Sequence, residues 1–204
     1  MTKIDKTQIS GLILAGGRGT RMGEINKGLQ LLDNRPLILW VIQALQNQVA
    51  HLMINANQDL DRYQEFGFPI CADHIPDYAG PLAGIHAGLK ACNTEYLISA
   101  PCDSPFLADD IVARLAQAMQ DDNSEIAVAY TVENIDGVLK KQVHPVFSLI
   151  HKSCLASLEQ FLSRGERKIR AWHAQHRVSE VQFENVQAFM NINTLDQLKH
   201  QQST

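Results

Sequence analysis

The sequence predicts an α/β protein with a doubly wound, mostly parallel sheet of Rossmann-like type and helices on both faces. Short segments rich in Val, Ile and Leu alternate with longer segments of helical periodicity, which is the pattern of repeated βαβ units. A hydrophobic share of 45% and a charged share of 20% are those of globular proteins, so disordered and fibrous classes are excluded. The 204 residues fit one domain with a single substantial core.

The elements of the first half follow from apolar runs and their boundaries. Residues 9–15 form a continuous apolar run ending in glycines, so we expect a buried strand there. Pro36 is suited to the first turn of a helix, and apolar residues at helical spacing continue to about Gln48. The other expected elements are a strand at 51–55, a short helix at 59–66, a strand at 69–72, a helix at 82–92 and a strand at 96–100.

The second half continues the alternation with one interruption. A helix at 109–120 is followed by strands at 126–130 and 143–149, with a polar loop expected between the two strands. We then expect helices at 152–162 and 167–176, a strand at 178–183 and a closing helix from about Leu195.

Composition also restricts the compartment and the partners. Four cysteines, Cys71, Cys92, Cys102 and Cys154, lie far apart without a C-x-x-C pair, which fits a reducing cytosol. The run at 9–15 is too short to cross a membrane, and the residues before it lack the pattern of a signal peptide. A formal net charge of -4 argues against a general nucleic-acid surface. The sequence therefore predicts a cytoplasmic protein without membrane or nucleic-acid partners.

A glycine-rich loop with two arginines follows the first expected strand. Its sequence, LAGGRGTRMG at 14–23, stands where open α/β sheets bind ligands. Glycines let backbone N–H groups approach phosphate oxygens, and Arg18 and Arg21 can add charge-assisted hydrogen bonds to the same anion. A mere glycine turn would leave the arginines and Lys27 unexplained, so we interpret the loop as a phosphate site.

Two familiar phosphate loops do not fit these residues. A dinucleotide fingerprint needs a glycine where Met22 stands and an acidic residue where the second strand ends in Asn55. A Walker A loop needs Gly-Lys followed by Ser or Thr, whereas Lys27 lies between Asn26 and Gly28. Neither an NAD enzyme nor a P-loop NTPase is indicated.

Acidic and amide side chains follow other expected strands at the same edge of the sheet. Asp103 comes directly after the strand at 96–100, so its carboxylate could meet Mg²⁺ held by triphosphate oxygens. Capping of the next helix explains Asp103 less well, because Asp109 is nearer that helix. Asp73 and Asn55 could bind nucleotide or simply form turns, and the residues alone leave both readings open.

Several motifs together resemble a known family. The loop at 14–22 followed by Lys27 resembles nucleotidyltransferases that activate sugars or cofactors with a nucleoside triphosphate. The motifs at 80–84 (GPLAG), 101–105 (PCDSP) and 191–194 (NINT) narrow the resemblance to molybdenum cofactor guanylyltransferases. This implies a fold of nucleotide-diphospho-sugar transferase type and transfer of GMP from GTP to the terminal phosphate of the molybdenum-pterin cofactor, with Mg²⁺ as cofactor.

The resemblance also assigns roles to residues. Arg21 and Lys27 would stabilise the triphosphate and its developing charge, and Asp103 would hold Mg²⁺. The nucleotide-binding positions would be Leu14, Ala15, Gly16, Gly17, Lys27, Asn55, Asp73 and Asp103, with the Leu14–Gly16 stretch against guanine. We expect one domain over residues 1–204, with nucleotide binding at about 9–107 and acceptor binding at about 108–200.

The acceptor half offers weaker signals. Five of the 18 basic residues fall in a short stretch that we expect to form one basic helix face, namely Arg164, Arg167, Lys168, Arg170 and Arg177. A solvated surface explains them equally well, but the resemblance around Arg167 and Lys168 favours a role with the pterin phosphate. His144 matches a family position, although packing is its ordinary explanation. Asn191 and Asn193 flank Ile192 in a strand-like pattern, so both could hold one ligand, while Asn193 could also cap a helix.

Other functions fit parts of this pattern. A sugar-1-phosphate or cytidylyl-type nucleotidyltransferase would share the first loop but use another acceptor or base. A non-catalytic GTP-binding module would need the loop without a metal role for Asp103. The resemblance leaves open a delivery protein or molybdoenzyme chaperone as a further partner.

Overall fold

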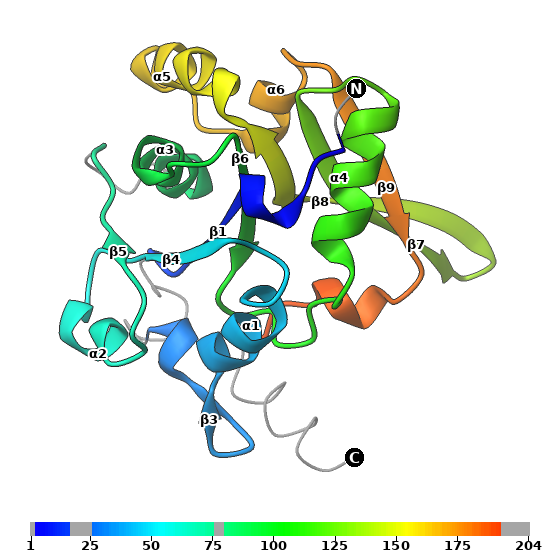
Figure 1. The fold of residues 1–204 in the computed structure, drawn as a ribbon. Coiled ribbons are helices and arrows are strands. Elements are labelled where there is room, and N and C mark those ends of the chain that lie inside the picture. The colour runs from blue at the N-terminus through cyan, green and yellow to red at the C-terminus, as the bar shows by residue number, and fades with distance from the viewer. Residues whose placement is uncertain (1–2, 17–25, 76–79, 193–204) are drawn as a thin grey trace.

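The computed structural model describes residues 3–16, 26–75 and 80–192. A central seven-stranded sheet runs through the molecule (Figure 1), and β8 alone runs opposite to the other strands. In spatial order the strands are β5 (Ile70–Cys71), β4 (His51–Asn55), β1 (Ile9–Leu14), β6 (Tyr96–Pro101), β8 (Val138–His151), β7 (Ile126–Ile135) and β9 (Val178–Phe183). The predicted α/β class with a mostly parallel sheet is confirmed.

Helices cover both faces of the sheet and enclose two apolar cores (Figure 1). Alternate side chains of β1 enter opposite cores, Ile9 and Ile13 on one face and Leu12 on the other, which is why this strand is a continuous apolar run. The first core is closed by α1 (Leu37–Leu45) and α4 (Ile111–Asp121), and the second by α3 (Pro81–Ala91), α5 (Leu155–Ser163) and α6 (Ile169–His173). The short helix α2 (Leu60–Gln64) lies beside β5 at the sheet edge.

The carboxyl ends of the three central strands lie level with one another. Leu14 pairs with Asn55 of β4 and with Pro101 of β6. The hydrogen bonds continue one residue further, since the Ala15 N–H donates to the Asn55 carbonyl at 2.8 Å and the Cys102 N–H donates to the Leu14 carbonyl at 3.1 Å. Whatever follows these strands is therefore gathered at one edge of the sheet.

The predicted polar loop between the strands at 126–130 and 143–149 is wrong. These residues extend β7 and β8 into a long hairpin whose turn contains Asp136 and Gly137, both with positive φ. The part of this hairpin that extends beyond the main sheet is exposed on both faces. Its sequence therefore lacks the alternation of apolar and polar residues that would predict strands.

Smaller elements also depart from the sequence prediction. A two-stranded hairpin, β2 (Leu31–Leu32) with β3 (Arg35–Pro36), turns at Asp33 and Asn34, which both have positive φ and form the kind of tight turn these residue types tolerate. The expected helix at 152–162 begins as a 3-10 turn, η4 (Lys152–Cys154), before α5, and the expected helix at 167–176 is shorter, comprising only the residues of α6. Other 3-10 turns that sequence did not predict are η1 (Lys6–Gln8), η3 (Lys27–Leu29) and η5 (Val186–Phe189).

Two further expectations concern the chain's end and membranes. The closing helix expected from Leu195 lies outside the described residues. Over the part of the chain that the structure describes, no helix combines the length and apolar character needed to cross a bilayer.

Candidate active site

Asp103 and Lys27 form an ion pair at the carboxyl edge of the sheet. Asp103 follows β6 and is 6% exposed, and its Oδ2 lies 3.3 Å from the Lys27 Nζ in η3. Burial raises the pKa of the Asp103 carboxyl, and the Lys27 charge opposes that rise. The structure thus brings together the two residues to which we assigned charge stabilisation and metal binding.

Contacts that the sequence did not predict hold the short turn that carries Lys27. The preceding Asn26 donates from Nδ2 to Asp59 at 3.0 Å and accepts a 2.5 Å hydrogen bond from the Tyr63 hydroxyl. Gly28 allows this close packing, because a Cβ there would lie 2.8 Å from the Tyr63 oxygen. Tyr63 is fully buried, so the short turn that carries Lys27 is anchored to the core.

Asp73 lies in a clamp made by two asparagines. The Asn55 Nδ2 donates to Asp73 Oδ1 and the Asn57 Nδ2 donates to Oδ2, both at 2.8 Å. The Asp73 N–H in turn donates to Asn57 Oδ1 at 2.8 Å. Each carboxylate oxygen is thus oriented by a separate amide. Asn57, to which the sequence assigned no site role, binds Asp73 through both its amide nitrogen and its amide oxygen.

Two glycines let the surrounding backbone approach this clamp. A Cβ on Gly16 would lie 2.7 Å from Asn57 Nδ2 and 3.0 Å from Asn55 Oδ1. A Cβ on Gly84 would lie 2.4 Å from Asn55 Oδ1 and 2.5 Å from a methyl carbon of Leu14. The end of β1 and the first turns of α3 therefore pack closely against Asn55. This packing brings four predicted nucleotide positions into one cluster, namely Leu14, Gly16, Asn55 and Asp73. Ala15, between Leu14 and Gly16, is 7% exposed and packs in the first core.

The segment near residue 191 is held against Asp103. The Ile192 N–H donates to the Asp103 carbonyl at 2.9 Å, and the Ser104 hydroxyl donates to Asn191 Oδ1 at 2.7 Å. The strand-like pattern expected here is wrong for the described residues, because Asn191 and Ile192 form no strand. Both hydrogen bonds join them to the loop after β6. Asn191 nevertheless lies at the same edge as the ion pair.

His144 occupies a packed position. Its ring is 9% exposed, stacks on Phe189 at 4.7 Å and shares a 2.9 Å hydrogen bond with the Thr131 hydroxyl. Burial lowers the pKa of His144, so the ring is neutral near pH 7. The geometry assigns it packing and hydrogen bonding within an aromatic cluster that includes Phe147 and Phe183.

The expected single basic helix face is wrong. Of the five basic residues only Arg170 lies within α6. The helix α5 ends before Gly165, whose φ is +80°. In the turn that follows, Arg167 Nη1 donates to the carbonyl oxygens of Leu162 and Glu166, both at 2.8 Å. Arg167 and Lys168 are exposed in the turn between the two helices.

Contacts along α5 indicate where that turn lies. Lys152, just before α5, donates to the carbonyl of Cys92 at the end of α3, and Glu159 further along α5 lies 3.3 Å from His86. The two helices are therefore antiparallel, and the α5–α6 turn lies toward the start of α3, on the side of the sheet's carboxyl edge (Figure 1).

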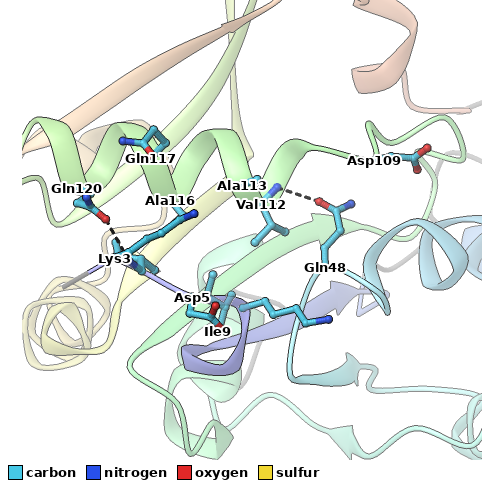
Figure 2. A pocket seen from close by; sticks show the side chains of 12 residues that line it. Lys3, Asp5, Ile9, Gln48, Asp109, Val112, Ala113, Ala116, Gln117 and Gln120 are labelled. Carbon is cyan, nitrogen blue, oxygen red and sulfur yellow. Dashed lines mark hydrogen bonds between the residues drawn. The ribbon is translucent and has the colours of Figure 1, made fainter.

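Three predicted site residues, Gly17, Arg21 and Asn193, lie outside the described residues. A hollow of about 340 Å³ lies elsewhere, beside Ile9 at the opposite end of β1, and none of the predicted site residues lines it. Figure 2 shows two hydrogen bonds among the lining residues, in which Gln48 accepts from the Val112 N–H and Gln120 accepts from the Ile4 N–H. We assign this hollow no function.

Several solved structures share this fold. The molybdopterin-guanine dinucleotide biosynthesis protein A from Archaeoglobus fulgidus superposes with a TM-score of 0.72 at 20% identity, over 95% of this chain and 97% of its own. The 4-diphosphocytidyl-2C-methyl-D-erythritol synthase from Anaerococcus prevotii superposes with a TM-score of 0.74 at 13% identity, over 98% of both chains. At these identities the likeness concerns the fold.

Comparison of sequences identifies much more similar proteins than the structural superpositions do. The molybdenum cofactor guanylyltransferase of Cupriavidus taiwanensis is 50% identical over 196 residues, which cover 96% of this chain and 97% of the relative. The enzyme of the same name from Bordetella pertussis is 46% identical over 200 residues, which cover 98% and 100%. A family model described as the MobA-like NTP transferase domain matches residues 11–181. The chain therefore belongs to the MobA-like NTP transferase family.

Proposed function

We propose that this protein transfers GMP from GTP to the terminal phosphate of the molybdenum-pterin cofactor, releasing pyrophosphate. The observation that carries the proposal is the Lys27–Asp103 pair beside the Asn55–Asp73 clamp, where level strand ends gather charged and polar groups. The near-half identity to relatives named molybdenum cofactor guanylyltransferase supports both the nucleotide and the acceptor.

The nucleotide would lie over the ends of β1 and β4. The backbone at Leu14, Ala15 and Gly16 would face the guanine, because the Ala15 side chain packs in the first core. The clamped Asp73 would accept hydrogen bonds from the base or the ribose. Gly17 and Arg21 of the glycine loop and Lys27 beside it would bind the phosphates. These roles make residues 9–107 the nucleotide-binding part.

The residues at Asp103 fit Mg²⁺. One buried carboxylate at the phosphate edge suits an ion that prefers oxygen ligands and commonly takes one or two carboxylates together with substrate phosphates. Asp103 would hold Mg²⁺ there, and the Lys27 ammonium would interact with the triphosphate as well as with Asp103. When bound, Mg²⁺ supplies neutralisation of charge on the triphosphate and on the departing pyrophosphate.

The chemistry needs position and charge rather than proton transfer. An oxygen of the acceptor's terminal phosphate forms a bond to the α-phosphorus of GTP, while the bond from that phosphorus to the bridging α–β oxygen breaks. Pyrophosphate leaves with the electron pair. Because the attacking phosphate is already anionic, no general base is required, and Lys27 and Arg21 would offset the repulsion between the two anions.

The acceptor would lie on the other side of Asp103, in residues 108–200. Asn191 is already bonded to Ser104 beside Asp103, and the turn with Arg167 and Lys168 faces the same edge. Asn193 continues from Asn191. The packing of His144 favours a supporting role for that residue. A GTP-dependent biosynthetic reaction of this kind belongs in the cytoplasm, where a delivery protein or molybdoenzyme chaperone would receive the product.

The test is a substrate panel with product identification. The purified protein is mixed with Mg²⁺, molybdenum-pterin cofactor and GTP or CTP, and in a parallel series with glucose-1-phosphate or mannose-1-phosphate as acceptor. Pyrophosphate and the pterin guanine dinucleotide should appear only with GTP and the pterin. Turnover with CTP or with a sugar phosphate in preference would replace the proposal by one of those enzymes, and GTP binding without pyrophosphate would indicate a binding module.

A further inference from the structure

Three side chains of different chemistry converge at the amino end of the sheet, away from Asp103. Glu125 precedes β7, Cys154 belongs to η4 (Lys152–Cys154), and His176 follows α6. One carboxylate oxygen, Sγ and Nδ1 of these residues all lie within 4.8 Å of one another. We propose that this triad is a binding site for a borderline-soft divalent transition ion, Zn²⁺ being the ion its ligands suit best.

Two of the three spacings are close to those of tetrahedral coordination. Cys154 Sγ lies 3.8 Å from His176 Nδ1, and that nitrogen lies 3.7 Å from Glu125 Oε2. With Zn–S, Zn–N and Zn–O bonds of about 2.3, 2.1 and 2.0 Å, a tetrahedral ion separates sulfur from nitrogen by about 3.6 Å and nitrogen from oxygen by about 3.4 Å. Shifts of a few tenths of an ångström bring the two pairs that include the His176 nitrogen to these separations, and the sulfur and the carboxylate oxygen lie within 4.8 Å of each other.

A second layer of contacts orients the histidine. His176 Nε2 lies 2.6 Å from the Ser157 hydroxyl oxygen, which also accepts a 2.9 Å hydrogen bond from the Trp172 indole N–H. An ion on Nδ1 requires the ring proton to be on Nε2, and the Ser157 oxygen is placed to accept that proton. Zinc-binding histidines are commonly held in this way through their other nitrogen.

The charges balance a divalent ion. The backbone N–H of Arg177 donates to Glu125 Oε2 at 3.2 Å, which helps to orient this carboxylate. The Cys154 thiol gives up its proton when an ion binds, because the thiolate is the metal ligand. One carboxylate and one thiolate then neutralise Zn²⁺, which lowers the cost of burying each charge.

The ion would have a structural role. It would tie the start of β7 to the start of α5 and to the connection between α6 and β9. The Glu125 side chain is 33% exposed while that of His176 is 8% exposed, so an ion would enter past Glu125 and a water molecule would complete its coordination from that side. The α5–α6 turn, with Arg167 and Lys168, lies between two of the ligands along the chain and would be stabilised by the ion.

The first test uses the unmodified full-length protein, stripped of metal with a chelator and titrated with Zn²⁺ and with Co²⁺. We expect one ion per chain, a higher melting temperature, and a near-ultraviolet thiolate-to-cobalt absorption band that millimolar Mg²⁺ does not abolish. Zinc affinity should rise about tenfold from pH 7 to pH 8, because one thiol proton leaves on binding. Absence of the cobalt band would overturn the proposal without any variant.

The second test uses matched variants. Cys154→Ala and His176→Gln should each weaken zinc binding by on the order of 100-fold or more, and Ser157→Ala by about 10- to 100-fold. Cys92→Ala is the control, because Cys92 is also a buried free cysteine but does not belong to the triad. Zinc affinity unchanged in Cys154→Ala, or lost equally in Cys92→Ala, would show that the ion binds elsewhere.

Discussion

The Lys27 ammonium lies 3.3 Å from the Asp103 carboxylate, although 75 residues and three strands of the main sheet separate the two in the chain. Asp103 is 6% exposed, and burial raises its pKa despite the nearby cation. Such an arrangement maintains a buried charge at the expense of stability, which is typical of sites that act on a charged ligand. The contribution of each partner to binding, catalysis and stability can be separated by substitution.

Asp103→Asn should lose activity without losing stability. A raised native pKa means that the folded state holds the Asp103 proton more tightly than the unfolded chain does. Stability from this group is therefore lost as pH rises from the ordinary value of 3.8 through the raised one, and the loss persists at pH 7. The neutral amide avoids that loss, so we expect an unchanged or higher melting temperature at pH 7 together with a decrease in kcat of about 100-fold or more.

Two readouts separate this prediction from a turn role for Asp103. The Mg²⁺ titration of activity should shift to higher concentration in Asp103→Asn, because an amide ligates the ion more weakly than a carboxylate. The decrease in kcat should exceed any rise in KM for GTP. A folded variant with parental turnover and the parental Mg²⁺ titration would remove Asp103 from the metal site.

Asn57→Ala should weaken GTP binding while sparing the chemical step. The substitution removes both 2.8 Å hydrogen bonds that join Asn57 to Asp73, so the carboxylate keeps only the Asn55 amide on its other oxygen. Loss of about 1.4 kcal/mol corresponds to a tenfold rise in KM for GTP, which is the size we expect. Steady-state kinetics measure it, with Asn134→Ala on the exposed hairpin as the control. Unchanged KM would show that Asp73 is not part of the nucleotide site.

Gly84→Ala and Gly88→Ala test whether α3 must approach the clamp. They lie one helical turn apart, and an added Cβ would meet Asn55 and Leu14 at Gly84 but Leu12 and Leu97 at Gly88. Overpacking costs about 1–3 kcal/mol in each case, offset by about 1 kcal/mol of helix propensity. Urea unfolding should therefore show similar small losses, whereas only Gly84→Ala should raise KM for GTP. Equal kinetic effects would assign both glycines to packing.

The parallel part of the fold could be predicted because the physics is local. Strands buried on both faces are continuous apolar runs, as at Ile9–Leu14, and their carboxyl ends necessarily share an edge. Asp103, Asn55 and Asp73 could be assigned to that edge for the same reason. Lys27 was found through its position after the glycine loop.

The remaining parts depend on contacts that no local pattern records. Asn57 reads as a turn residue until Asp73, 16 positions away, is seen to bind both ends of its amide. Asn26 is anchored by the hydroxyl of Tyr63. Tyr63 is fully buried, so the sequence suggests only a core position for it and not this hydrogen bond. In the basic stretch a helix was expected from Arg167, but α6 begins at Ile169. The hydrogen bond from Arg167 back to Leu162 of α5, which holds the turn, could not be predicted from charge alone.

Acid should destabilise the protein through His173. Its ring is 5% exposed, and burial lowers its pKa from 6.5 to about 4. A lowered native pKa gives stability that is fully present above pH 6.5 and is lost as pH falls toward 4, amounting to roughly 3 kcal/mol for this group. His173→Leu should flatten that part of the stability profile, measured by urea unfolding between pH 7 and pH 4. A profile as steep as the parent's would place the acid sensitivity in other groups.

Reversing the charge of Lys168 should weaken use of the pterin substrate and leave GTP unaffected. Lys168 is preferred to Arg167 for this test, because the Arg167 guanidinium binds the carbonyl oxygens of Leu162 and Glu166 and its loss would disturb the turn itself. Lys168 is exposed at the start of α6, so substitution costs little packing.

The antiparallel contact between α3 and α5 directs this turn toward the edge that holds Asp103, so a glutamate at Lys168 would repel an incoming phosphate. We expect KM for the pterin to rise about tenfold at low salt and less at 0.5 M salt, because exposed charges are screened. Lys140→Glu, equally a charge reversal but on the exposed hairpin, should leave both substrates unaffected. If Lys168→Glu and Lys140→Glu behave alike, the basic turn is a solvated surface and the acceptor phosphate binds elsewhere along the edge.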